Sequence, residues 1–108
     1  MAHDGIILVN PQMDRAYLLY RIAGRDRAAL KSLYDDIGPK LFALLVRASD
    51  NREMAEGLLV DTFVGIWRTA HLFAESPANA DIWLFHAARA TAFDFKMRNK
   101  TSDVTRDV

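Results

Sequence analysis

The sequence predicts an all-α fold, a compact bundle of about four helices in one domain. Apolar residues recur at helical spacing over most of the chain, residues that cap or break helices separate these runs, and no segment alternates as a strand would. The length of 108 residues fits one domain at most, and a hydrophobic content of 51% supports a folded domain rather than a disordered one.

The first expected helix begins at Asp14, where apolar residues start to recur at helical spacing. Gly24 is placed to end this helix. Residues 1–13 are expected to form a loosely ordered N-terminal arm, with the apolar run at 6–9 tucked against the domain.

The second expected helix is interrupted by a proline. Asp26 can cap its start, and the helix should bury Leu33 and Tyr34. Pro39 has no N–H group to donate to the carbonyl four residues back, so we expect the chain to break or kink there. A helix then resumes through Ala48.

The third expected helix starts where Asp50 and Glu53 have the spacing of a capping box, and it runs to about Ala70. A loop at residues 71–81 follows, because this stretch contains a proline and several small polar residues. Its end overlaps the start of the next helix, whose exact boundary the sequence leaves open.

The fourth expected helix runs from about Ala80 to Arg98. Asn79 is the preferred N-cap, and Ser76 followed by a proline at the first helical position is the alternative. Residues 99–108 form a polar tail that we expect to fray.

Composition and motifs exclude several classes of protein. The chain has no cysteine, a net charge of zero, and no apolar run of the roughly 20 residues that a membrane span needs. Its three histidines, His3, His71 and His86, accompany no catalytic or metal-binding motif. We therefore expect a cytoplasmic protein that is not an enzyme, with no metal, no cofactor and no membrane partner.

The third helix carries an unusual outward face. The side opposite its apolar stripe has Gly57, Val60 and Val64 beside only two charged residues, Asp61 and Arg68. Contiguous apolar residues on an exposed face are typical of a protein interface. Scattered surface valines are the alternative, since single exposed apolar side chains are common.

The last helix is the one basic region. Arg89, Lys96, Arg98 and Lys100 outnumber Asp94, and the first two are seven residues apart and so share a face. Such a stripe can lie along a phosphate backbone, although an ordinary solvated face remains the alternative. Four aromatic residues lie on the same helix, most of them needed for the core and one or two able to stack on unpaired bases: Trp83, Phe85, Phe93 and Phe95.

The order of three stretches resembles region 2 of extracytoplasmic-function (ECF) sigma factors, which are bacterial transcription initiation subunits. The stretches are RIAGRDRAALKSLYDDIGPKLFALL, NREMAEGLLVDTFVGIWRTAHLF and WLFHAARATAFDFKMR. Together they cover about residues 14–98, which would make this range the sigma region 2-like domain and 99–108 a tail or the start of an interdomain linker. Complete factors of this family continue into a helix-turn-helix domain that reads the minus-thirty-five element.

The resemblance implies two working surfaces. In the family, the third helix docks on a coiled coil of the RNA polymerase largest subunit. The loop and last helix hold the promoter's minus-ten element as single-stranded DNA, with a flipped base captured by the loop. The implied polymerase-binding positions are Glu56, Gly57, Val60, Asp61, Val64 and Arg68. The implied DNA-binding positions are His71, Ser76, Asn79, Arg89, Lys96, Arg98 and Lys100.

Several positions depart from the family pattern. The third helix of the family usually reads Ala-Glu-Asp-Leu-x-Gln-Glu, whereas this chain has Gly57 for the Asp, Val60 for the Gln and Asp61 for the Glu. In the last helix, Ala90 replaces an asparagine and Met97 an arginine. Each lost polar contact is worth about 1–3 kcal/mol of binding.

These departures leave a second hypothesis open. The chain would then be a sigma-like interaction module that binds an anti-sigma factor, or itself, without initiating transcription. The face that carries Gly57, Val60 and Val64 would make the contact, because a glycine lets a partner approach the backbone closely.

Overall fold

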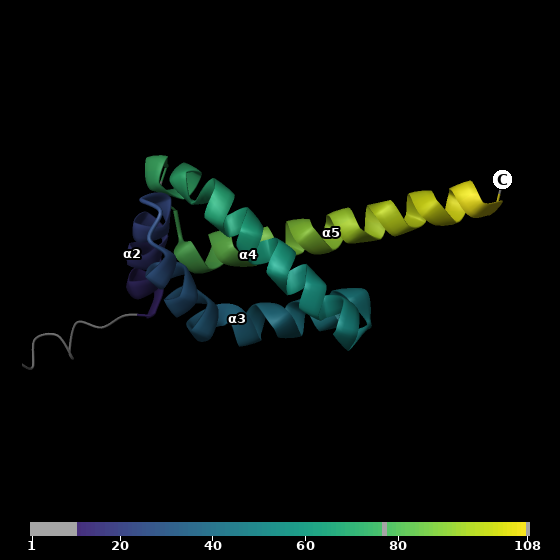
Figure 1. Cartoon of the computed structure of the whole chain (residues 1–108), viewed down its shortest axis with the longest axis horizontal. Helices are drawn as coiled ribbons and strands as arrows, with labels where there is room; N and C mark the ends of the chain where they lie inside the picture. Colours follow the sequence, from purple (N-terminus) through teal and green to yellow (C-terminus); the bar gives the residue numbers. More distant parts are fainter. Residues whose placement is uncertain (1–10, 77, 108) are drawn as a thin grey trace, which may run out of the picture.

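Four helices make up the part of the chain that the structure describes. The computed structural model describes the backbone of residues 11–76 and 78–107, and the side chains of 14–76 and 78–99. The helices are α2 (Pro11–Ala23), α3 (Arg27–Ser49), α4 (Arg52–Glu75) and α5 (Ala80–Asp107) (Figure 1). Within these ranges no residue belongs to a strand, so the predicted all-α, four-helix fold is confirmed.

The core forms where α4 crosses the other three helices. It packs against α2, α3 and α5, and the fully buried side chains of all four helices meet along its apolar stripe. The largest of these side chains are Leu19, Ile22, Leu33, Ile37, Leu41, Leu45, Ile66, Phe73 and Leu84. Burying such side chains supplies roughly 1.5–3 kcal/mol each, so this crossing is the main source of stability.

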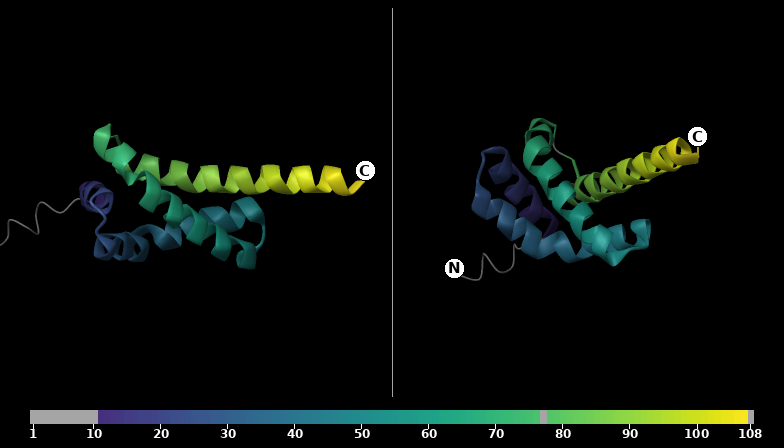
Figure 2. Two further views of the ribbon diagram at one scale, coloured as in Figure 1. Left: turned by 45° about the horizontal axis from the view of Figure 1, so that its top comes forward. Right: turned by 45° about the vertical axis from the view of Figure 1, so that its right-hand side comes forward.

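The first half of α5 packs on the bundle through a stripe in which alanine predominates. Ala80, Leu84, Ala88 and Ala92 recur every fourth residue and are all buried. The second half extends away from the other helices (Figure 2). Residues 99–107 are helical, so the expected frayed tail is wrong for the described residues.

The turn between α2 and α3 is a Schellman motif. The Asp26 N–H donates to the Arg21 carbonyl at 3.1 Å, and the Arg25 N–H donates to the Ile22 carbonyl at 2.8 Å. The residue in the left-handed conformation is Arg25, with φ of 70°, rather than Gly24. Arg25 holds this conformation while its guanidinium donates to the Trp67 carbonyl at 2.7 Å.

Two of the three predicted helix caps are confirmed. Asp26 accepts from the Ala29 N–H at 3.1 Å, and Asn79 accepts from the Ile82 N–H at 3.0 Å. The capping box at Asp50 and Glu53 is wrong, because Asp50 ends α3 in the left-handed conformation. Asn51 caps α4 instead by accepting from the Met54 N–H at 2.9 Å.

Other helix boundaries also differ from the sequence predictions. The helix α3 continues through Pro39 without the expected break. Pro39 and Asp35, whose carbonyl loses its helical donor, both lie on the exposed side of α3, where water can replace that bond. At its start, α2 begins at Pro11 instead of Asp14, and the arm at residues 1–10 lies outside the described part of the chain.

A buried arginine ties three helices together. Arg15 of α2 is 6% exposed. Its Nε donates to Asp36 of α3 at 2.8 Å, and its Nη1 donates to Asp81 of α5 at 2.8 Å. The hydrogen bond to Asp36 is the main cause that raises the pKa of Arg15, so this guanidinium stays charged. The first turn of α5 is thereby fixed against α2 and α3.

Replacing Arg15 by methionine tests this clamp. The variant Arg15→Met keeps most of the buried apolar volume but leaves two carboxylates without their cation. We expect the free energy of unfolding, measured by urea denaturation, to fall by about 1–3 kcal/mol, less than for a wholly buried pair because both carboxylates are partly exposed. Lys31→Met, which breaks an exposed pair with Asp35, should cost less than about 1 kcal/mol. Equal losses in the two variants would contradict the clamp.

Candidate functional site

The outward face of α4 brings together all six positions that the resemblance implies for polymerase binding. Each is exposed: Glu56, Gly57, Val60, Asp61, Val64 and Arg68. The two valines are 59% and 47% exposed, respectively. Because the opposite side of α4 fills the core, these six residues are available to a partner.

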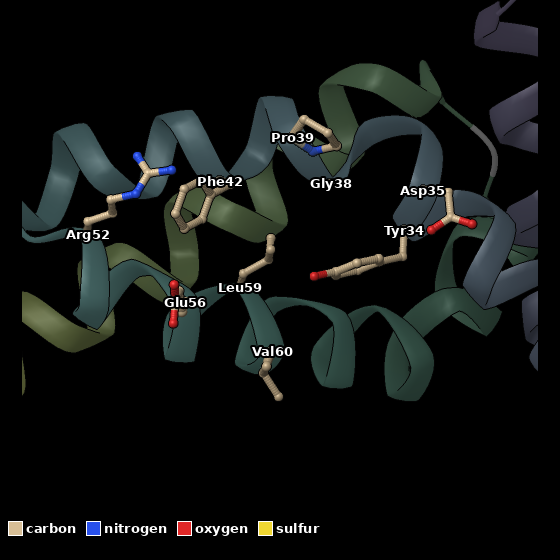
Figure 3. A pocket seen from close by; sticks show the side chains of 9 residues that line it. All are labelled: Tyr34, Asp35, Gly38, Pro39, Phe42, Arg52, Glu56, Leu59 and Val60. Atoms are coloured by element: carbon tan, nitrogen blue, oxygen red, sulfur yellow. The ribbon is translucent and has the colours of Figure 1, made fainter.

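An apolar surface continues from this face onto α3. A hollow of about 640 Å³ lies between the two helices. Phe42 and Leu59 point into it, whereas Val60 points outward from α4 (Figure 3). Its lining residues are Tyr34, Asp35, Gly38, Pro39, Phe42, Arg52, Glu56, Leu59 and Val60.

A second hollow adjoins the first. It has a volume of about 370 Å³ and is lined by Arg27, Leu30, Phe63, Val64 and Trp67. The ring of Tyr34 in the first hollow meets that of Phe63 in the second edge to face, with centroids 5.0 Å apart. We call the two hollows together the α3/α4 seam.

The α3 wall of this seam was missed in the sequence. Four residues that line it recur every fourth position: Leu30, Tyr34, Gly38 and Phe42. The helix break expected at Pro39 separated Phe42 from the other three. Tyr34, expected to be buried, is 44% exposed. The periodicity read straight through the proline would have identified this wall.

Two arginines fix the aromatic rings at the ends of the seam. The guanidinium of Arg52 lies 5.1 Å from the centroid of Phe42, and that of Arg25 lies 4.9 Å from the centroid of Trp67. Such cation–π contacts hold the rings in place and put a positive charge at each end of the seam. The seam therefore combines an apolar centre with a polar rim, which is the usual anatomy of a protein interface.

The connection between α4 and α5 is shorter than the loop expected at 71–81. Residues 71–75 belong to α4, so His71 is an exposed helix residue and not a loop residue. Ser76 ends α4 and is exposed. Asn79 uses its side-chain oxygen to cap α5, which gives it a structural role.

An aromatic cluster anchors both ends of this connection. Phe73 of α4 meets Tyr20 of α2 and Trp83 of α5 edge to face, with centroids 5.8 Å and 5.7 Å apart. Phe73 is 1% exposed. These ring contacts therefore fix the end of α4 and the first turns of α5 against each other and against α2.

The basic residues of α5 do not form one stripe. Arg89 and Lys96 are both exposed and seven residues apart, so they share a face. Arg98 is nine residues from Arg89, which is about two and a half helical turns and places it on the opposite side. The side chain of Lys100 lies outside the described residues.

The face of α5 that carries Arg89 also borders a third hollow, of about 570 Å³, between α3 and α5. It is lined by Lys40, Ala43, Leu44, Arg47, Ala48, Phe85 and Arg89. We call it the α3/α5 groove. The sequence did not predict the two cations that α3 contributes, Lys40 and Arg47, because no local pattern shows that they face α5.

The described residues contain neither a cluster of metal ligands nor a membrane-spanning helix. No three histidine, aspartate or glutamate side chains there gather as metal ligands would. None of the helices in that part of the chain is both long and apolar enough to cross a membrane.

The structure thus combines a four-helix bundle with an apolar seam beside α4 and a cationic groove between α3 and α5. A family model described as Sigma-70 region 2 matches residues 33–101, more than half of the chain. The chain therefore belongs to the sigma-70 region 2 family, as the resemblance implied. Members of this family are transcription initiation factors, so the prediction that the chain is not an enzyme is confirmed.

Two relatives that match this chain are ECF sigma factors, which agrees with the family assignment. The ECF RNA polymerase sigma factor SigK of Mycobacterium bovis is 30% identical over 77 residues, 71% of this chain and 41% of the relative. SigK of Mycolicibacterium vanbaalenii is 28% identical over 100 residues, 93% of this chain and 50% of the relative. The chain thus spans half or less of the length of these relatives. No solved structure gives a significant match.

Substitution of Gly57 tests whether the fold of α4 itself requires a glycine at this position. A Cβ atom added at Gly57 or at Gly65 would meet no atom within 4 Å. We expect Gly57→Ala and Gly65→Ala each to raise the free energy of unfolding by about 0.5–1 kcal/mol in urea denaturation, because alanine favours a helix. Destabilisation by Gly57→Ala would show that the glycine is needed for the fold itself.

Proposed function

We propose that this domain docks on the coiled coil of the RNA polymerase largest subunit and holds the minus-ten promoter element as single-stranded DNA during transcription initiation. It would do so in the cytoplasm, where the polymerase works. The observation that carries the proposal is the gathering of all six implied docking positions on one exposed face of α4, beside the α3/α4 seam.

The docking surface favours an apolar grip over a polar one. The family's Asp and Gln are absent here, since Gly57 and Val60 occupy their positions. Val60 borders the first hollow of the seam and Val64 the second, so a helix laid along α4 would cover both. Burial of apolar surface at roughly 25 cal/mol per Å² can offset the lost polar contacts. Asp61 keeps one negative charge for the partner.

The DNA surface divides into a recognition end and a backbone end. The connection after α4 is anchored by Phe73 and Trp83, so it can present backbone groups and Ser76 to an extruded base. Arg89 and Lys96 follow on one face of α5 and can meet phosphates. Arg98 lies on the other side, so we assign it a smaller part in the same contact.

Charge reversal at Asp61 tests the docking surface. We expect Asp61→Arg to weaken binding to the isolated polymerase coiled coil by about a hundredfold or more, because an attraction becomes a repulsion. Isothermal titration calorimetry can measure the affinity. The matched control Asp94→Arg reverses an exposed aspartate of α5 and should bind as the unchanged chain does. Absence of any binding by the unchanged chain at high micromolar concentration would refute the proposal.

A second candidate function rests on the exposure of Val60 and Val64. The seam could serve an anti-sigma factor or a second copy of the chain, without transcription initiation. Under this alternative, light scattering of the purified chain detects a dimer that Val60→Glu disrupts. A monomeric profile for both proteins, together with coiled-coil binding, would favour the first function over self-association.

A further inference from the structure

Three exposed arginines border the second hollow of the α3/α4 seam. Arg27 lines this hollow itself, and Arg68 lies one turn beyond Val64, which lines it from α4. The guanidinium of Arg25 lies 4.9 Å from the ring centroid of Trp67, another lining residue. We call these three arginines the arginine cluster.

The positive charge of the arginine cluster is not neutralised within the described side chains, where none of its members forms an ion pair. Asp26, which adjoins two of the three arginines in the chain, is already engaged. It accepts from Nε of Arg21 at 2.8 Å and from the Ala29 N–H at 3.1 Å. Because this carboxylate already has a cation, it weakens the potential of the cluster only slightly.

Negative charge on α4 lies about two turns from the cluster. Asp61 precedes Arg68 by seven residues and Glu75 follows it by seven, roughly 10 Å along the helix in each case. Glu56 lies still earlier on the outward face and lines the first hollow. Along the seam, from Glu56 to Arg68, the outward face of α4 therefore changes from negative to positive.

Arg25 has an unfavourable backbone conformation. Its φ of 70° lies in the left-handed region, which is costly for a residue with a Cβ atom and easily adopted by a glycine such as the adjacent Gly24. Its side chain makes one hydrogen bond to the described residues, from Nη1 to the Trp67 carbonyl at 2.7 Å. The other N–H groups of the guanidinium are thus open to a partner. Strain kept at such a residue points to a functional role.

We propose that the arginine cluster is a carboxylate-binding site, which takes acidic side chains of the helical protein that docks on the α3/α4 seam. Guanidinium groups bind carboxylates through paired, charge-assisted hydrogen bonds. The apolar lining of the second hollow lies beside these donors, and a docked helix would exclude water from the contact, which strengthens it. The site therefore recognises an amphipathic helix with apolar residues flanked by glutamate or aspartate.

The identity of the partner rests on the proposed function, and the carboxylate site adds the direction in which that partner lies. Asp61 attracts a basic residue of the partner helix, and Arg68 attracts an acidic one about two turns away. A partner helix turned end for end would bring like charges together. The order of charges along the seam thus selects one of the two directions.

Isothermal titration calorimetry with the isolated polymerase coiled coil tests the cluster on the proposed partner. We expect Arg27→Gln and Arg68→Gln each to weaken binding about fivefold and to make it less dependent on salt, because an ion pair across the interface is lost. The matched control Arg47→Gln removes an exposed arginine of α3 that lies outside the seam, and it should bind as the unchanged chain does. An equal loss in this control would overturn the proposal, since net charge alone would then explain the binding.

Two substitutions of Arg25 separate a binding role from a structural one. Arg25→Ala keeps a Cβ atom in the left-handed conformation, whereas Arg25→Gly relieves the strain, so urea should unfold the alanine variant at the lower concentration. Both variants lack the guanidinium, and both should bind the coiled coil about fivefold more weakly. If the glycine variant binds like the unchanged chain, Arg25 serves the fold alone and the proposal is contradicted.

A pair of labelled peptides tests the preference for carboxylates without the polymerase. Each peptide is an amphipathic helix of about 18 residues with leucines along one face, flanked by glutamates in one peptide and by glutamines in the other. We expect fluorescence anisotropy to show about tenfold tighter binding of the glutamate peptide to the unchanged chain. This preference should disappear in the double variant Arg27→Gln/Arg68→Gln.

The two probes separate this inference from the proposed function. If the unchanged chain binds no coiled coil but prefers the glutamate peptide, the proposed docking fails and the carboxylate site stands. If the cluster variants bind the coiled coil as the unchanged chain does and both peptides bind equally, the carboxylate site is overturned and the docking stands. Binding of neither probe would reject both.

Discussion

The arrangement of the two surfaces depends on one buried guanidinium. Arg15 joins α2 to Asp36 on α3 and to Asp81 at the start of α5, while α4 crosses the same three helices through its apolar stripe. The hydrogen bonds of Arg15 fix the direction in which α5 leaves the bundle. The crossing of α4 supplies most of the apolar burial. Together they leave one side of α4 open and place α5 beside α3.

The helix α3 serves both surfaces because its two flanks differ in chemistry. Tyr34 and Phe42 face α4 and complete an apolar seam, whereas Lys40 and Arg47 face α5 and complete a cationic groove. Continuity through Pro39 makes this possible, since a break would have changed the register between the flanks. The two flanks of α3 thus present different chemistry, so two partners that used them would not compete for the same side chains.

The features of the fold that have local sequence signals were predictable. Helical periodicity gave the fold class, and the caps at Asp26 and Asn79 act over three residues, so both were predictable. The exposed face of α4 was also predictable, because its apolar stripe left the opposite side to solvent. The α3 wall of the seam and the cations of the groove were not, because they depend on which helices become neighbours in space. The Arg15 clamp joins residues 21 and 66 positions apart, and no short pattern reveals such a pair.

The central claim is that the chain presents two separate surfaces to two partners. Amide chemical-shift mapping of the labelled chain, titrated in turn with the polymerase coiled coil and with single-stranded minus-ten DNA, tests it most directly. The account predicts that the coiled coil perturbs α4 between Glu56 and Arg68 with the seam residues of α3, and that the DNA perturbs the α4–α5 connection and the first half of α5. A single set of residues that responds to both partners would contradict it.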